Sequence, residues 1–276
     1  MNKQQLIDQI RRKKSFLCVG LDSDSTLLPP HLPQTAEGVL TFNKAIIDAT
    51  ADLVVAYKPN EAFYEPLGAE GLEALGKTIE YIHNKYPEIM VILDAKRGDI
   101  GNTSAQYAHA AFEELGADAV TTAPYMGRDS ISPFLEYNDR WTVLLALTSN
   151  AGSADFQHLR LEDGRLLYQV VLETATSWAS DEQLMFVAGA TQATLFGQIR
   201  EIAPEYFLLV PGVGKQGGSL EEVCNYGMTS ECGLIVNSSR GIIFASKGKD
   251  FAEAARAKSL ALQAEMEREL RRHHVI

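Results

Sequence analysis

The strongest constraint on the fold is a series of eight short apolar segments that alternate with amphipathic ones. Strands covered on both faces are almost continuously apolar, whereas half-exposed strands alternate apolar and polar residues. These segments are of the first kind, so the pattern predicts buried parallel strands joined by helices. The predicted strands are 15–22, 53–59, 89–96, 118–124, 142–149, 184–191, 206–212 and 233–239.

Amphipathic segments fit between these strands, for example 36–50 and 71–86. Further helices are expected at about 2–14 and at about 249–272. Eight strand–helix units in 276 residues are typical of one α/β domain, a (β/α)8 TIM barrel spanning 1–276.

Composition excludes several classes of function. The net charge of −11 would repel the phosphates of a nucleic acid, so no nucleic-acid partner is expected. The three cysteines include no C-x-x-C pair, which argues against a disulfide framework or a zinc site. The first residues have no apolar core like that of a signal peptide, and no apolar stretch is long enough for a membrane span. We therefore expect a cytoplasmic protein.

Polar residues gather where the predicted strands end, and in a barrel the reactive groups lie at these carboxyl ends. Taken singly they have ordinary explanations: Asp22 could cap a turn, and Lys58 could extend to solvent. The residues at the strand ends are Asp22, Lys58, Asn60, Asp94, Lys96, Asp99, Thr148, Ser149 and Asn150, followed by the segments 211–219 and 237–241.

The last two of these segments favour a phosphate site. The loops after strands seven and eight bind phosphate in many barrels. Here "PGVGKQGGS" begins at Pro211 and carries Gln216, and "NSSRG" carries Arg240. Backbone N–H groups of a glycine-rich loop and a bidentate guanidinium are typical ligands of an anion. The alternative is a flexible turn, but the combination predicts a phosphate-bearing ligand.

The segment "ILDAKRGDIGNT" places charged residues at the end of a buried strand, where they are costly unless they pair or take part in chemistry. Asp94 and Lys96 are two residues apart and should point to the same side of the strand. Asp99 follows in the loop, and Lys58 comes from the adjacent strand. An alternating Lys–Asp–Lys–Asp array would hold an ammonium group rigidly. The alternative is an ion-pair network that closes the barrel mouth.

"LDAKRGDIGNT" resembles the D-x-K-x-x-D-I-x-x-T signature of the orotidine 5′-phosphate decarboxylase family. The resemblance extends over the chain, with "GLDSD" after strand one, "YKPN" after strand two, "PGVGKQGG" after strand seven and the late Arg240. The wording "DAKRGDIGNT" is similar to that of a divergent bacterial-type subgroup. Because a wider superfamily of sugar-phosphate enzymes shares the signature, the phosphate loops and "YKPN" matter to the assignment.

The resemblance implies a carbon–carbon lyase that converts orotidine 5′-monophosphate to UMP and CO2 in pyrimidine biosynthesis, without a metal or an organic cofactor. Asp94 would lie near the substrate carboxylate and disfavour it. Lys96 would stabilise the negative charge at C6 and then protonate that carbon. Lys58 and Asp99 would orient the array and hold the ribose hydroxyls, with Asp22 also on the sugar.

The resemblance also implies the remaining contacts and a homodimer. Asp99, Ile100 and Thr103 would come from the neighbouring subunit. Gln216 and Arg240 would bind phosphate, and either Thr148 or Ser149 would contact the pyrimidine, with Ser149 favoured. The segment 150–165 is an insertion relative to the common form. The implied set of substrate-binding residues is Asp22, Asn60, Ile100, Thr103, Ser149, Pro211, Gln216 and Arg240.

Two other functions remain possible from the sequence. One is a metal-dependent keto-sugar-phosphate decarboxylase or aldolase of the same superfamily, which a chelator would inactivate. The other is a catalytically silent sugar-phosphate sensor, which would bind nucleotide without turnover. The charge density at Lys58, Asp94, Lys96 and Asp99 argues against a sensor, because binding alone does not need it.

Overall fold

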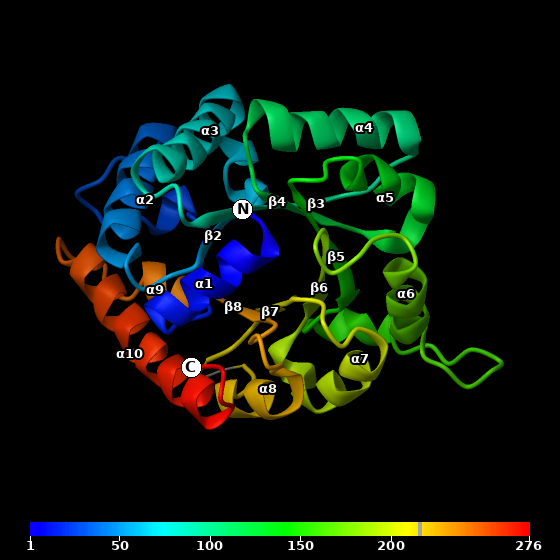
Figure 1. Cartoon of the computed structure of the whole chain (residues 1–276). Helices are drawn as coiled ribbons and strands as arrows, with labels where there is room; N and C mark the ends of the chain where they lie inside the picture. The colour runs from blue at the N-terminus through cyan, green and yellow to red at the C-terminus, as the bar shows by residue number, and fades with distance from the viewer. Residues whose placement is uncertain (215–216) are drawn as a thin grey trace.

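The computed structural model describes residues 1–214 and 217–276. Within these residues, eight parallel strands close into a barrel in sequence order, and β1 pairs with β8. The predicted barrel is thus confirmed. Figure 1 shows the helices surrounding the strands. The strands are β1 Leu17–Leu21, β2 Ala56–Pro59, β3 Met90–Arg97, β4 Ala119–Thr122, β5 Trp141–Leu147, β6 Leu184–Ala188, β7 Leu208–Pro211 and β8 Leu234–Ser238.

Except for α1, the helices pack around the outside of the barrel, and their apolar sides are buried. Leu75, Ile79 and Ile82 of α3, for example, are fully buried at helical spacing. The helices are α1 Lys3–Lys13, α2 Ala36–Thr50, α3 Gly68–Lys85, α4 Gly101–His109, α5 Arg128–Leu135, α6 Leu167–Thr176, α7 Phe196–Ile202, α8 Leu220–Gly227, α9 Arg240–Ile243 and α10 Phe251–Arg272.

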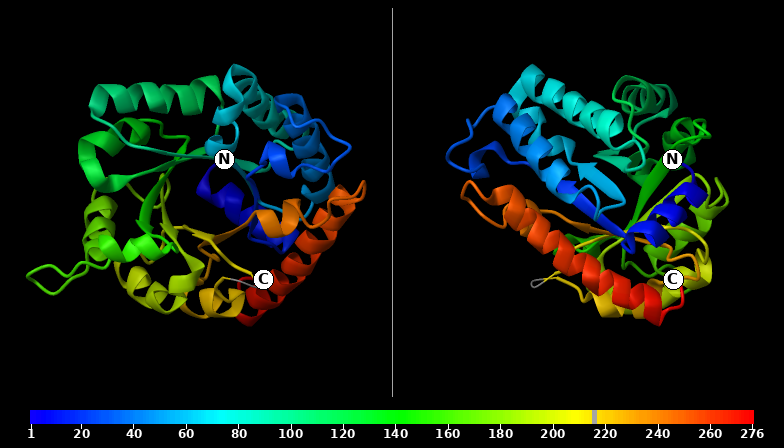
Figure 2. Two further views of the ribbon diagram at one scale, coloured as in Figure 1. Left: turned by 180° about the vertical axis from the view of Figure 1, so that it is seen from behind. Right: turned by 60° about the vertical axis from the view of Figure 1, so that its left-hand side comes forward.

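The two terminal helices lie in different places. Helix α1 directly precedes β1 and lies across one opening of the barrel (Figure 1). Lys3 of α1 forms ion pairs with Asp181 and Glu231, which precede β6 and β8, so this opening is the one where the strands begin. Helix α10 packs on the outside against α2 and α9, as both views of Figure 2 show. The opposite opening, where the strands end, is left for the site.

The segment after β5 differs most from a simple βα loop. It contains a 3-10 turn at Ala151–Asp155 and then a short antiparallel bridge between Arg160 and Leu166. In Figure 1 it projects away from the barrel as a long green loop before α6. Every helix among the described residues is too short or too polar to span a lipid bilayer.

Candidate functional site

The centre of the candidate site is the carboxylate of Asp94, which lies between two ammonium groups. Lys58 Nζ on β2 is 2.6 Å from Asp94 Oδ2, and Lys96 Nζ is 2.6 Å from Asp94 Oδ1. The Lys58 and Asp94 side chains are almost fully buried, whereas the side chain of Lys96 is 50% exposed. The structure thus brings together three of the four residues of the predicted array, with the exposed ammonium toward the barrel mouth.

The charges of this group hold one another ionised. Burial would raise the pKa of Asp94, but the ammonium groups of Lys58 and Lys96 outweigh it and lower this pKa to about 2. Burial would likewise lower the pKa of Lys58, but the carboxylates of Asp94 and Asp22 raise it above its usual range. At neutral pH the site therefore holds a permanent carboxylate beside two cations.

Asp99 is not part of this group in its own chain. Its Oδ1 accepts a hydrogen bond from the backbone N–H of Ile100, and among the described residues it forms no ion pair with Lys58 or Lys96. Ile100 follows at the N-terminus of α4 with 55% of its surface exposed, and Thr103 lies half-buried in the first turn. These three residues follow Lys96 in the chain but do not complete the array within it.

Asp22 and Asn60 lie next to the array at the ends of β1 and β2. Asp22 Oδ1 is 4.0 Å from Lys58 Nζ and is buried without a hydrogen-bond partner among the described residues. A buried carboxylate oxygen in this position can accept a hydrogen bond from a hydroxyl group of a ligand. Asn60 faces Asp94 across an isolated parallel bridge, and its side chain caps the turn that follows by accepting from Ala62 N.

Thr148 and Ser149, at the end of β5, have different surroundings. Gln157 Nε2 donates to the Thr148 hydroxyl, which in turn donates to Asn150 Oδ1, so the insertion engages Thr148. Ser149 instead packs against the ends of β6 and β7. A Cβ atom on Gly189 would lie 2.6 Å from Ser149 N, and one on Gly212 would lie 3.5 Å from Ser149 Oγ.

The predicted phosphate loops lie side by side at the ends of β7 and β8, where Pro211 is in register with Asn237. Arg240 begins α9 and is exposed. The glycine-rich loop differs from the expectation in one respect, because several of its N–H groups already bond within the loop: Gly217 N donates to Gly214 O, and Gly218 N to Gly212 O. They are therefore not free for an anion in this conformation. Gln216 lies outside the described residues.

Two side chains beside the array were missed by the sequence analysis. Thr121 on β4 donates to Asp94 Oδ1 and accepts from the Lys96 backbone N–H. Arg97, directly after Lys96, pairs with Glu61 Oε1 at 2.7 Å and stacks over the ring of Tyr107. Two buried threonines, Thr121 and Thr122, end the short strand β4, and the sequence does not distinguish the one that meets Asp94.

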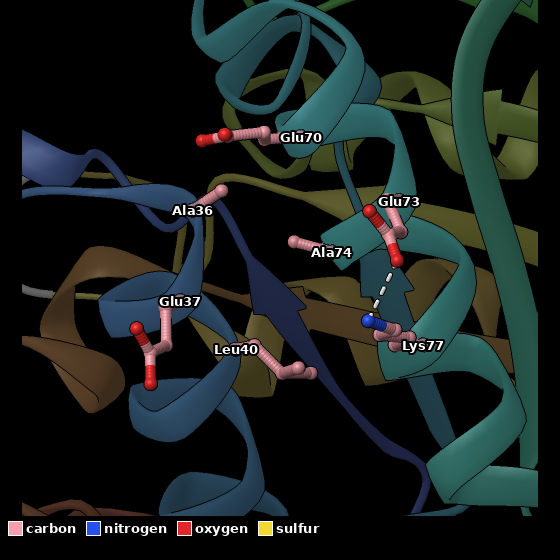
Figure 3. A pocket seen from close by; sticks show the side chains of 7 residues that line it. All are labelled: Ala36, Glu37, Leu40, Glu70, Glu73, Ala74 and Lys77. Carbon is pink, nitrogen blue, oxygen red and sulfur yellow. Dashed lines mark ion pairs between the residues drawn. The ribbon is translucent and has the colours of Figure 1, made fainter.

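A pocket lies on the outside of the barrel between α2 and α3, away from the Asp94 group (Figure 3). Its lining includes Glu37, Glu70 and Glu73, and Glu73 forms an ion pair with Lys77 at 2.7 Å. None of the predicted site residues lines it. Within the described residues no cluster of three or more His, Cys, Asp or Glu side chains could hold a metal ion.

Comparison with known proteins adds to this geometry. The sequence model of the "Orotidine 5'-phosphate decarboxylase / HUMPS family" matches residues 15–257. A protein of Bacteroides fragilis (strain YCH46) named orotidine 5′-phosphate decarboxylase is 58% identical over 271 residues, which cover 98% of this chain and 99% of the relative. The relative from Christiangramia forsetii, of the same name, is 58% identical over 98% of this chain and 99% of its own length.

Two solved structures are similar to this chain over nearly its whole length. The structure of Leishmania donovani OMP decarboxylase has a TM-score of 0.79 and 38% identity, covering 95% of this chain and 98% of that one. The Leishmania donovani UMP synthase structure has a TM-score of 0.81 and 39% identity over 94% of this chain. This chain spans 56% of the length of that second protein.

Proposed function

Because the chain belongs to the orotidine 5′-phosphate decarboxylase / HUMPS family, we propose that it converts orotidine 5′-monophosphate to UMP and CO2 in pyrimidine biosynthesis. The observation that carries the proposal is the buried Asp94 carboxylate held between the ammonium groups of Lys58 and Lys96. The relatives with 58% identity bear the decarboxylase name, which favours this reaction over that of a metal-dependent keto-sugar-phosphate enzyme.

The chemistry of the reaction explains why such a site is needed. When the bond between C6 and the carboxylate breaks, CO2 leaves and the electron pair stays on C6 in an sp2 orbital, out of conjugation with the ring carbonyls. The Lys96 ammonium stabilises this charge, and its proton moves to C6, after which the neutral amine regains a proton from solvent. Asp94, ionised at neutral pH, holds the Lys96 ammonium through an ion pair of 2.6 Å and disfavours the substrate carboxylate beside it.

The rest of the nucleotide would bind around this centre. Asp22 and Lys58 hold the ribose hydroxyls, Asn60 borders the same edge, and Ser149 contacts the pyrimidine. Arg240 and Gln216 bind the phosphate beside Pro211. Binding energy from the phosphate, remote from the reacting carbon, contributes to stabilising the transition state.

The proposed enzyme is a homodimer in which Asp99, Ile100 and Thr103 reach the partner's site. Two observations support this arrangement: Asp99 forms no ion pair with the lysines of its own chain among the described residues, and Ile100 is an exposed apolar side chain. Tyr125 and Met126, after β4, are further exposed apolar side chains, at 89% and 49%. Burial of such apolar side chains against a second subunit would stabilise the dimer.

The proposal is tested by following the absorbance of orotidine 5′-monophosphate after purified protein is added in the presence of EDTA. We expect the substrate absorbance to decay at the same rate with and without the chelator, because the proposed mechanism uses no metal or organic cofactor. Activity that is lost with EDTA and restored by a divalent ion would favour the metal-dependent alternative. Binding of UMP without turnover would favour the sensor.

A further inference from the structure

The pairing of β3 with β4 is interrupted at the candidate site. Ile92 and Leu93 are in register with Ala119 and Val120, but the next paired residues are Arg97 and Thr122. Three residues of β3, from Asp94 to Lys96, therefore face the single residue Thr121. An irregularity of this kind re-aims side chains and is common beside active sites.

Thr121 occupies this irregularity with both of its hydrogen-bonding capacities in use. Its Oγ1 accepts from the Lys96 backbone N–H at 2.9 Å and donates to Asp94 Oδ1 at 2.9 Å. The direction is fixed because an N–H group can only donate and an ionised carboxylate can only accept. The same Oδ1 accepts from Lys96 Nζ at 2.6 Å, so Lys96 is tied to Thr121 and Asp94 at both its backbone and its ammonium group.

The backbone of Lys96 shows why such a tie is needed. Its φ is +49°, in the left-handed region that residues with a Cβ atom adopt only at a cost. Strained backbone persists where the surrounding structure enforces it. The hydrogen bond from Lys96 N–H to the buried Thr121 hydroxyl, which is 1% exposed as a residue, is a local contact that does so.

We infer that Thr121 is a positioning residue, which sets the Lys96 ammonium relative to Asp94 through the Lys96 backbone. The inference rests on the proposed function, because it assigns Lys96 the proton transfer. A defect in positioning should lower kcat and leave the binding of the distant phosphate and ribose nearly unchanged.

The test compares Thr121→Val with Thr121→Ser and with a matched control. Valine keeps the shape of threonine but can neither accept from Lys96 N–H nor donate to Asp94, whereas serine can do both. The control is Thr122→Val on the same strand, because the Thr122 hydroxyl is buried without a partner among the described residues. It repeats the chemical change without breaking a hydrogen bond.

We expect Thr121→Val to lower kcat by about 10- to 100-fold, the effect of leaving a partly buried donor unpaired, with KM changed by less than about 3-fold. Thr121→Ser and Thr122→Val should keep kcat within about 3-fold of the wild type. Wild-type kcat in Thr121→Val would overturn the inference. So would a loss that Thr121→Ser shares, since that would indicate packing of the methyl group.

Failure of the Thr121 inference and failure of the proposed function give different results. If Thr121→Val does not fold, Thr121→Ser is compared with Thr121→Ala, which lacks the hydroxyl but adds no new atoms; equal kcat values would overturn the inference. If the wild-type protein does not decarboxylate the substrate, the proposed function itself fails. An active wild type with an unaffected Thr121→Val variant leaves the function standing and removes Thr121 from it.

Discussion

Lys58 and Asp94 form a buried ion pair across neighbouring strands, with 2.6 Å between Nζ and Oδ2. Either charge would be unfavourable alone in this position. Burial by itself would raise the pKa of Asp94 and lower the pKa of Lys58, which favours the neutral form of each. Together they keep one another ionised over a wide pH range. The pair therefore anchors the Lys96 ammonium, which meets the other oxygen of the same carboxylate.

The first prediction concerns acid stability. The pKa of Asp94 is lowered to about 2 in the folded protein, so its stabilising effect is complete above the unfolded value of about 3.9 and is lost as the pH falls through 2. Between pH 6 and pH 3, the free energy of unfolding of the wild type should fall by about 1 kcal/mol more than that of Asp94→Asn. Urea unfolding of both proteins measures this. Parallel pH dependences would show that Asp94 has an ordinary pKa.

The contribution of Lys58 to stability depends on pH at the alkaline end. Its pKa is raised, so its contribution is complete below its unfolded pKa of about 10.4 and disappears only as the pH rises through the higher folded value. Over the neutral range the ion pair should therefore contribute a constant amount to stability.

The second prediction is that Lys96→Ala abolishes turnover and leaves the fold intact. The Lys96 side chain is half exposed, so its removal creates no cavity, but it removes the ammonium that delivers the proton to C6. Thermal melting and steady-state turnover are measured together, with Lys77→Ala as a control for loss of an exposed lysine in an ion pair. A melting transition lost along with activity would indicate that the array only stabilises the barrel mouth.

The third prediction is that Arg240→Ala acts through binding. Arg240 is exposed at the start of α9, so its loss should not affect folding. We expect kcat/KM to fall about 100-fold or more, as for a charge-assisted bidentate contact. The penalty should shrink sharply for orotidine, which lacks the phosphate. Equal penalties with both substrates would place Arg240 outside the phosphate site.

The fourth prediction tests the shared site. Lys96→Ala and Asp99→Ala should each be inactive alone and should complement when mixed. In a mixed dimer one site carries both lesions, and the other combines an intact Lys96 with the partner's intact Asp99. Random reassortment makes about half of the dimers mixed, so about a quarter of all sites should recover, given closed two-fold pairing.

Subunit exchange in that experiment is verified by pull-down through a tag on one variant after mild denaturation and refolding. Confirmed exchange with no recovered activity would show that Asp99 serves the site of its own chain. Recovery near a quarter of the wild-type activity is the expected result for an Asp99 that reaches across the interface.

The barrel was predictable from the amino-acid sequence, and so was the gathering of charged residues at the end of β3. Burial on both faces makes strands continuously apolar, so the eight segments were visible without knowledge of their neighbours. The spacing of Asp94 and Lys96 likewise showed two charges at one strand end. These are local properties of the chain, and they survive in the observed strands with only their ends shifted.

Which side chains contact one another became visible only in the folded chain. Thr121 is 27 residues from Asp94 in sequence, and it contacts the array because β3 and β4 lose their regular register there. The same is true of Ser149, which rests on Gly189 and Gly212 of neighbouring strand ends, and of Asp99, which lies apart from the lysines. Hydrogen bonds between strands depend on register and backbone conformation, and both arise from long-range packing that local periodicity does not encode.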